Sequence, residues 1–160
     1  EEGTAIVQNI KDIIDDYSGL SRIVLDYSVA FKRIMDGAGA TDFSAKDWAP
    51  LAALVDTANF VRVGNFKEVM DWEAYTSFLT QWAPHAAWEC SFKRGTENGR
   101  AVFLEMEERT SMGGVSNTVN SLSVYEFTAH DKIGHLDIYL QMPMPDAAML
   151  QGYDGVAISG

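Results

Sequence analysis

Positive charge, cysteine and histidine are all scarce in this sequence. The 160-residue chain has only 12 Lys and Arg residues but 23 Asp and Glu residues, which gives it a formal net charge of −11. Because phosphate groups bind to basic surfaces, this balance argues against a nucleic-acid or anionic-membrane partner. The single cysteine, Cys90, cannot form an intrachain disulfide, which is compatible with a reducing compartment. We therefore expect a cytoplasmic protein whose ligand is neutral, apolar or cationic.

Motifs typical of metal and cofactor sites are also missing. No HExxH, HxxxH or CxxC spacing occurs, so we expect no protein-bound catalytic metal. No GxGxxG or Walker loop is present, so no nucleotide cofactor is expected, and no GxSxG indicates a serine nucleophile. No apolar run approaches the roughly 18 residues that a membrane span requires.

What the sequence does contain is a folded-domain composition, with 47% hydrophobic and 22% charged residues. Hydrophobic periodicity predicts helices in the first half of the chain and strands in the second. We expect helices at 6–17, 20–34, 44–54 and 71–82, and strands at 59–63, 86–94, 100–110, 118–128 and 135–142. This order predicts an α+β domain in which N-terminal helices pack on a curved, mainly antiparallel sheet, giving a cone with an interior for a small molecule.

One domain accounts for residues 1–160, because no internal repeat or low-complexity tract divides the chain. Its core is expected at about residues 20–142. The tail at 143–160 is rich in Met, Pro and Gly and is expected to be a loose strap over the body.

The order of elements resembles the nuclear-transport-factor-like superfamily, the cone-shaped α+β fold of SnoaL-like proteins. Four segments carry the resemblance, which covers about residues 20–142: KDWAPL at 46–51 with LVDTANF at 54–60, the helix at 72–82, GRAVFLEMEER at 99–109, and YEF at 125–127 with DKI at 131–133. The superfamily includes isomerases, cyclases, dehydratases, epoxide hydrolases, dehydrochlorinases and dioxygenase small subunits, together with non-enzymes. Function must therefore be argued from a site.

His85, in the stretch WAPHAAW, lies where scytalone-dehydratase-like and dehydrochlorinase-like members carry a catalytic base. The resemblance implies that its imidazole takes a proton while an aspartate fixes its tautomer. Asp42, in the loop after the long helix, and Asp36, at the end of that helix, are the two candidates for this partner. The alternative is that His85 packs at a corner and both aspartates are solvated.

His135 and Asp137 resemble a second pair, the His-x-Asp of SnoaL-type cyclases. Strand alternation places Leu136 and Ile138 on one face and the pair on the other. If the apolar face lines the cone, the pair points outward, towards a dimer interface.

The middle strand offers a further carboxylate, because Met106 and Glu108 share one of its faces. Burial would favour the protonated acid of Glu108 unless Arg62 pairs with it. Tyr27 lies on the helix that often supplies a tyrosine donor in this superfamily; it could polarise a substrate oxygen or belong to the core. The remaining candidate wall residues, which could equally be core, are Trp48, Phe60, Trp88 and Tyr125.

These observations predict a cofactor-independent enzyme that moves protons on a small hydrophobic, aromatic hydroxy or carbonyl compound. His85 would be its base, Asp42 or Asp36 the orienting group, and Tyr27 or another polar pocket residue the electrophilic donor. Dehydration, isomerisation and a retro-aldol-type lyase step would all use these groups, and the dehydratase-like resemblance favours a lyase. The alternatives are a non-catalytic ligand-binding module and a structural small subunit of a ring-hydroxylating dioxygenase. A homodimer through the outer sheet face is expected.

Overall fold

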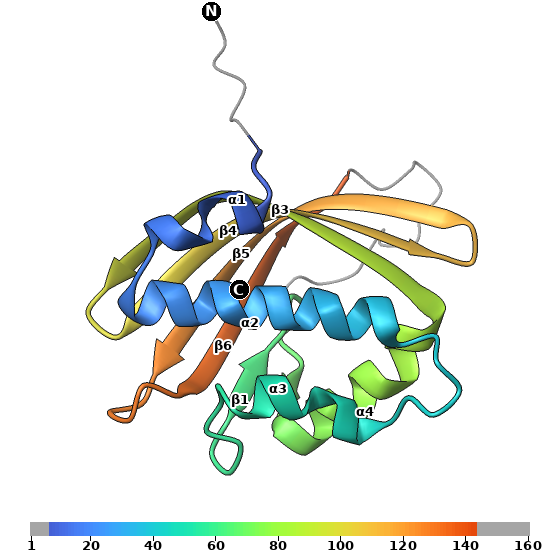
Figure 1. The fold of residues 1–160 in the computed structure, drawn as a ribbon, viewed down its shortest axis with the longest axis horizontal. Helices are drawn as coiled ribbons and strands as arrows, with labels where there is room; N and C mark the ends of the chain where they lie inside the picture. Colours follow the sequence, from blue (N-terminus) through green and yellow to red (C-terminus); the bar gives the residue numbers. More distant parts are fainter. Residues whose placement is uncertain (1–6, 144–160) are drawn as a thin grey trace, which may run out of the picture.

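The computed structural model of the chain shows one long helix, α2, lying across a strongly bent sheet, with the shorter helices α3 and α4 gathered at one end (Figure 1). The structure describes residues 7–143, so the tail expected at 143–160 lies outside the described residues apart from its first residue. The helices are α1 (Ile10–Ile13), α2 (Gly19–Gly37), α3 (Ala49–Ala52) and α4 (Trp72–Trp82), with 3₁₀ turns at Ile14–Asp16, Ala45–Trp48 and Ala83–His85. None of the described helices is long and apolar enough to cross a membrane.

The sheet has six strands in the order β2-β1-β6-β5-β4-β3. Their bounds are β1 (Val61–Val63), β2 (Val69–Met70), β3 (Ala86–Asn98), β4 (Ala101–Met112), β5 (Val115–Phe127) and β6 (Ile133–Gln141). Strand β1 pairs in parallel with β6, and all other neighbours pair antiparallel. The expected fold class, a cone-shaped α+β domain with a mainly antiparallel sheet, is confirmed.

The element boundaries differ from the sequence expectation in several places: strand β2 was not expected, β3 continues to Asn98, and the helix expected at 44–54 is a 3₁₀ turn followed by the short α3. The first helix ends at Ile13 and tightens into a 3₁₀ turn, so it is much shorter than the range 6–17. Strands β4 and β5 are longer than expected and form one continuous hairpin, because Gly113 and Gly114 adopt φ angles of 59° and 79° and close it tightly.

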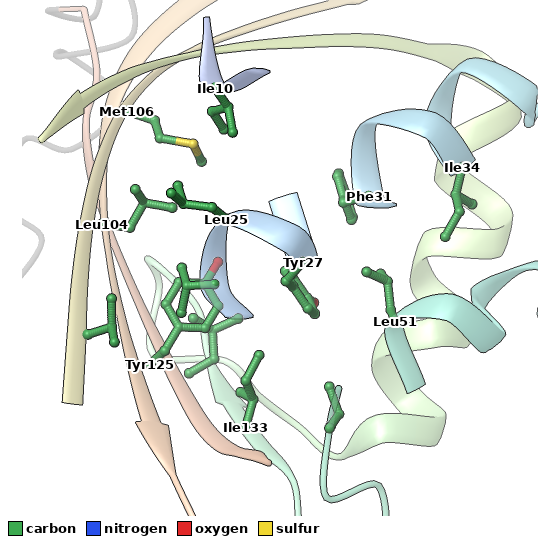
Figure 2. Close-up of a cluster of buried hydrophobic side chains, with 14 of the residues drawn as sticks. Ile10, Leu25, Tyr27, Phe31, Ile34, Leu51, Leu104, Met106, Tyr125 and Ile133 are labelled. Carbon is green, nitrogen blue, oxygen red and sulfur yellow. The ribbon is translucent and has the colours of Figure 1, made fainter. Parts of the chain in front are cut away.

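Helix α2 holds the core together because its apolar residues recur every three or four positions and face the sheet. Leu25, Tyr27 and Phe31 of α2 lie opposite Leu104 and Tyr125 of the sheet in the buried cluster (Figure 2). Helix α4 behaves as the sequence predicts at both ends. The Asp71 carboxylate accepts a hydrogen bond from the Ala74 N–H at 2.8 Å, and Pro84 is followed by no further α-helical turn.

The N-terminus of α2 is capped from a distant strand. The carboxylate of Glu97, at the end of β3, accepts hydrogen bonds from the backbone N–H and the hydroxyl of Ser21 at 2.8 and 2.9 Å. The Ser18 side chain at the N-cap position makes no such bond. Glu97 therefore satisfies a helix donor that local sequence leaves open, and its charge complements the helix dipole.

Replacing Glu97 with alanine is expected to lower the free energy of unfolding by about 1 kcal/mol, the usual size of a lost N-terminal cap. Glu97→Gln keeps an acceptor oxygen and should lose only part of this. Urea denaturation measures both changes. An unchanged midpoint for Glu97→Ala would show that this cap does not stabilise the helix.

Candidate functional site

A pocket occupies the interior of the cone between α2, α4 and the concave face of the sheet. Its inner part has a volume of about 70 Å³ and its mouth about 350 Å³. Both parts are lined by Phe31, Tyr75, Trp88, Glu108 and Ile138, which makes them one continuous pocket with a narrow bottom. Its mouth falls in the size range of small-molecule sites.

Three tyrosines meet at the bottom of this pocket. Tyr27 comes from α2, Tyr75 from α4 and Tyr125 from β5, and the Tyr27 and Tyr125 rings pack edge to face at 5.8 Å. Burial raises the pKa of each of the three, and for Tyr27 the neighbouring tyrosines add to the effect. These hydroxyls are therefore neutral hydrogen-bond donors near pH 7. Among the described residues, the buried Tyr27 Oη makes no hydrogen bond of normal geometry, and the Tyr75 hydroxyl is its polar neighbour.

Glu108 supplies a carboxylate to both parts of the pocket. Strand alternation turns it inward with Met106, which lines the inner part. The Trp88 indole Nε1 donates to Glu108 Oε1 at 2.8 Å, which holds the carboxylate against the cross-strand tryptophan. No described side chain or backbone group donates to its second oxygen, Oε2, so that oxygen is available to accept a proton.

Arg62, on β1, lines the mouth. Its Nη1 lies 3.4 Å from Glu68 Oε1, and its guanidinium carbon lies 4.9 Å from the centre of the Tyr75 ring. The ion pair that we considered between Arg62 and Glu108 is not formed in the described structure. Glu108 is held by Trp88 instead, and Arg62 contacts the turn between β1 and β2.

The predicted pairing of His85 with an aspartate is also absent from the described structure. His85 is exposed on the 3₁₀ turn Ala83–His85, is not part of the pocket wall and contacts neither Asp36 nor Asp42. Asp36 pairs instead with Lys32 on the surface, and Asp42 is exposed in a turn. The reason is local geometry: the turn after α4 directs the imidazole into solvent.

His135 and Asp137 do form a pair, with Nε2 of the imidazole 2.9 Å from Oδ1 of the carboxylate. It lies on the sheet face opposite the pocket, because the alternating neighbours Leu136 and Ile138 line the interior. Both side chains are half-buried. The homodimer expected through this outer face stays a prediction.

The other predicted wall residues divide into two groups. Trp88, Met106 and Tyr125 line the inner part of the pocket. Trp48 and Phe60 line neither part and belong to the core; the Trp48 indole donates to Thr80 Oγ1 at 3.0 Å.

Sequence reasoning missed three polar residues of the inner wall: Tyr75, Ser28 and Ser123. Tyr75 had the right helical spacing for a buried position, but nothing in the sequence indicated that its hydroxyl would meet Tyr27. Among the described residues, no group of three or more His, Cys, Asp or Glu side chains is placed to hold a metal ion. Cys90 lies beside this wall, and burial, with the nearby Glu108 charge, raises the pKa of its thiol to about 12.

No protein-family model and no curated protein sequence matches the chain. Solved structures do match. An NTF2-like protein of unknown function from Burkholderia pseudomallei is 14% identical over 84% of this chain and 97% of its own, with a TM-score of 0.63. A protein assigned as a SnoaL-like polyketide cyclase from Shewanella putrefaciens is 7% identical over 88% and 92%, with a TM-score of 0.63. An LEH-like epoxide hydrolase from M. tuberculosis is 15% identical over 67% and 80%, with a TM-score of 0.52.

These likenesses confirm the resemblance at the level of the fold. The chain has the NTF2-like, SnoaL-like architecture, in which enzymes and proteins of unknown function both occur. Because the identities are so low, the matches show the fold alone, and a function must be argued from the pocket.

Proposed function

We propose that the cone binds a compact, largely apolar compound bearing a carbonyl or hydroxyl oxygen, and that Glu108 transfers a proton on it. The observation that carries the proposal is the buried Tyr27 hydroxyl, which lies beside the Tyr75 hydroxyl but makes no hydrogen bond of normal geometry, in a pocket lined mainly by apolar groups. Leaving such a group unsatisfied costs about 1–3 kcal/mol, so a ligand oxygen that accepts its hydrogen bond is favoured.

The proton-transfer step follows from the positions of Glu108 and the tyrosines. Glu108 Oε2 takes a proton from the carbon next to a substrate carbonyl. The electron pair of that C–H bond forms a C=C bond, and the carbonyl electrons move onto oxygen as an enolate. A neutral tyrosine hydroxyl donates to this oxygen as its charge develops, which stabilises the transition state more than the ground state.

Two outcomes of this step correspond to isomerase and lyase chemistry. Return of the proton from Glu108 to a different carbon gives an isomer. In the dehydration, the enolate carbonyl re-forms, its C=C electrons make a double bond to the β-carbon as the C–O bond breaks, and the departing hydroxyl takes the proton held by Glu108 and leaves as water. In this proposal Glu108 takes the role that the sequence had suggested for His85, because His85 is exposed and outside the pocket.

Binding without turnover is the second candidate function. It is supported by the Trp88–Glu108 hydrogen bond, which is also what a purely structural carboxylate in a pocket wall would make. The two candidates share a ligand class and differ in whether Glu108 exchanges a proton with it.

A binding titration tests the ligand class. We expect cyclic ketones and hydroxyketones to quench or shift the fluorescence of Trp82 and Trp88, which line the pocket. Tyr27→Phe should weaken their binding roughly threefold to tenfold, the value of one neutral hydrogen bond, and should leave the deoxy analogues unaffected. Tyr139→Phe, on the outer face, is the matched control. Equal losses for ketones and deoxy analogues would argue against the proposed hydrogen bond.

A further inference from the structure

The guanidinium of Arg62 makes few hydrogen bonds for a charged group that is mostly buried. Its side chain is only 14% exposed. A guanidinium has five N–H donors, yet Glu68 Oε1 accepts from it only at the long distance of 3.4 Å, and the neighbouring Tyr75 hydroxyl is the other oxygen beside it. The Nε atom is buried and has no hydrogen-bond partner among the described residues. Arg62 therefore has donor capacity that the protein itself does not use.

Glu68 is a weak partner for Arg62 because it already accepts hydrogen bonds within the turn between β1 and β2. Its second carboxylate oxygen accepts a hydrogen bond from the Phe66 N–H at 2.9 Å, and its backbone carbonyl accepts one from the Gly64 N–H at 2.9 Å. The side chain is also 38% exposed, so water competes for it. Its contact with Arg62 can yield to a better placed acceptor at little cost.

The Tyr75 ring holds Arg62 in place. Because the guanidinium carbon lies 4.9 Å from the ring centre, the cation rests against the aromatic face. This contact engages one side of the guanidinium and leaves the N–H groups that do not point at the ring free for a planar acceptor. A carboxylate is the acceptor whose two oxygens match that geometry.

We infer that Arg62 binds a carboxylate of the ligand, so that the natural ligands are apolar carboxylic acids with a carbonyl or hydroxyl at their far end. The inference rests on the proposed function, since it assigns the ligand to the same pocket. The apolar body would lie in the mouth against Trp82, Phe78 and Leu140, with its oxygen towards the tyrosines.

The charges in the pocket wall are compatible with a ligand that carries one negative charge. Of the described residues in its wall, Arg62 is the one basic side chain and Glu108 the one acidic side chain. A carboxylate at Arg62 neutralises the cation and leaves Glu108 to act on an uncharged part of the molecule. The net charge of −11 opposes anions only at long range, because salt at physiological strength screens exposed charges beyond about 8 Å.

Matched pairs of ligands test the inference. Aromatic and alicyclic keto acids would be titrated beside their primary amides, which have the same shape without the charge, by isothermal calorimetry. Wild type is expected to prefer the acid roughly tenfold to a hundredfold, the range of a charge-assisted hydrogen bond. Arg62→Met should abolish this preference while changing amide binding less than about threefold.

Glu68→Gln provides an independent variant, because it removes the competing charge and keeps an acceptor for the Phe66 N–H. It is expected to tighten acid binding about twofold to fivefold and to leave amides unchanged. Circular dichroism and thermal unfolding show whether each variant is folded; if Arg62→Met is not, the acid-to-amide ratios of wild type and Glu68→Gln decide. Equal affinity for acids and amides in wild type would overturn the inference and leave the proposed function standing. If neither the keto acids, nor their amides, nor simple ketones bind, both the inference and the proposed function are overturned.

Discussion

Glu108→Gln is expected to lower kcat by about 10²–10⁴-fold on any ketone substrate of this pocket, the range that a positioned general base contributes. The amide can still accept the hydrogen bond from the Trp88 indole, so the wall should keep its shape. It cannot take a proton, however. Binding of unreactive ketones should therefore change less than about threefold, because the tyrosine donors are untouched.

The same strand supplies a control for this variant. Glu107 lies next to Glu108 but faces the other side of the sheet, where its carboxylate pairs with Arg109 at 2.8 Å. Glu107→Gln removes one carboxylate of equal size from β4 and is expected to leave kcat within about twofold. Stopped-flow or progress-curve assays measure kcat, and calorimetry measures binding. Full turnover by Glu108→Gln would exclude Glu108 as the base and favour the binding-only function.

The parts of this site that the sequence predicts correctly are those set by strand periodicity. Successive side chains of a strand must point to opposite faces, so the inward position of Met106 and Glu108 follows from the apolar stripe of β4. The same alternation predicts that His135 and Asp137 point away from the cone once Leu136 faces inward. The fold class was also predictable, because the order of helices and strands restricts the possible layers.

Residues in turns and at distant pairings could not be predicted in this way. His85 lies in a 3₁₀ turn, where no periodicity relates its direction to that of the following strand. Arg62 belongs to a three-residue strand whose parallel pairing with β6 joins segments more than 70 residues apart in the chain. Tyr75 meets Tyr27 only because α4 and α2 pack around the same cavity. Such contacts arise from tertiary packing and leave no local signal.

The stability of the fold is expected to fall steeply above pH 10. Burial raises the pKa of Tyr27, Tyr75 and Tyr125 above the ordinary value, so the folded chain keeps three protons that the unfolded chain releases. The contribution is fully present below the pKa of unfolded tyrosine, near 10, and is lost as the pH rises above it. Each group lowers the free energy of unfolding by up to about 1.4 kcal/mol per pH unit. For the three tyrosines together, the slope approaches about 4 kcal/mol per pH unit. Since domains of this size are stable by about 5–15 kcal/mol, this is enough to unfold the protein within a few pH units.

Urea unfolding at successive pH values, followed by circular dichroism, measures this slope. Tyr125→Phe removes one of the three buried hydroxyls and should reduce the slope by roughly one third, whereas Tyr139→Phe, whose side chain is exposed, should not change it. The Cys90 thiol, whose pKa burial raises to about 12, adds a similar loss that begins at lower pH, and a Cys90→Ala background removes it. Tyrosinate absorbance gives the independent check, because the three buried hydroxyls should ionise only as the chain unfolds. If all tyrosines titrated near pH 10 while the chain stayed folded, the three hydroxyls would be in contact with water. The inner part of the pocket would then not exclude water, and the hydrogen-bond donors that the proposed ligand chemistry requires would not be buried.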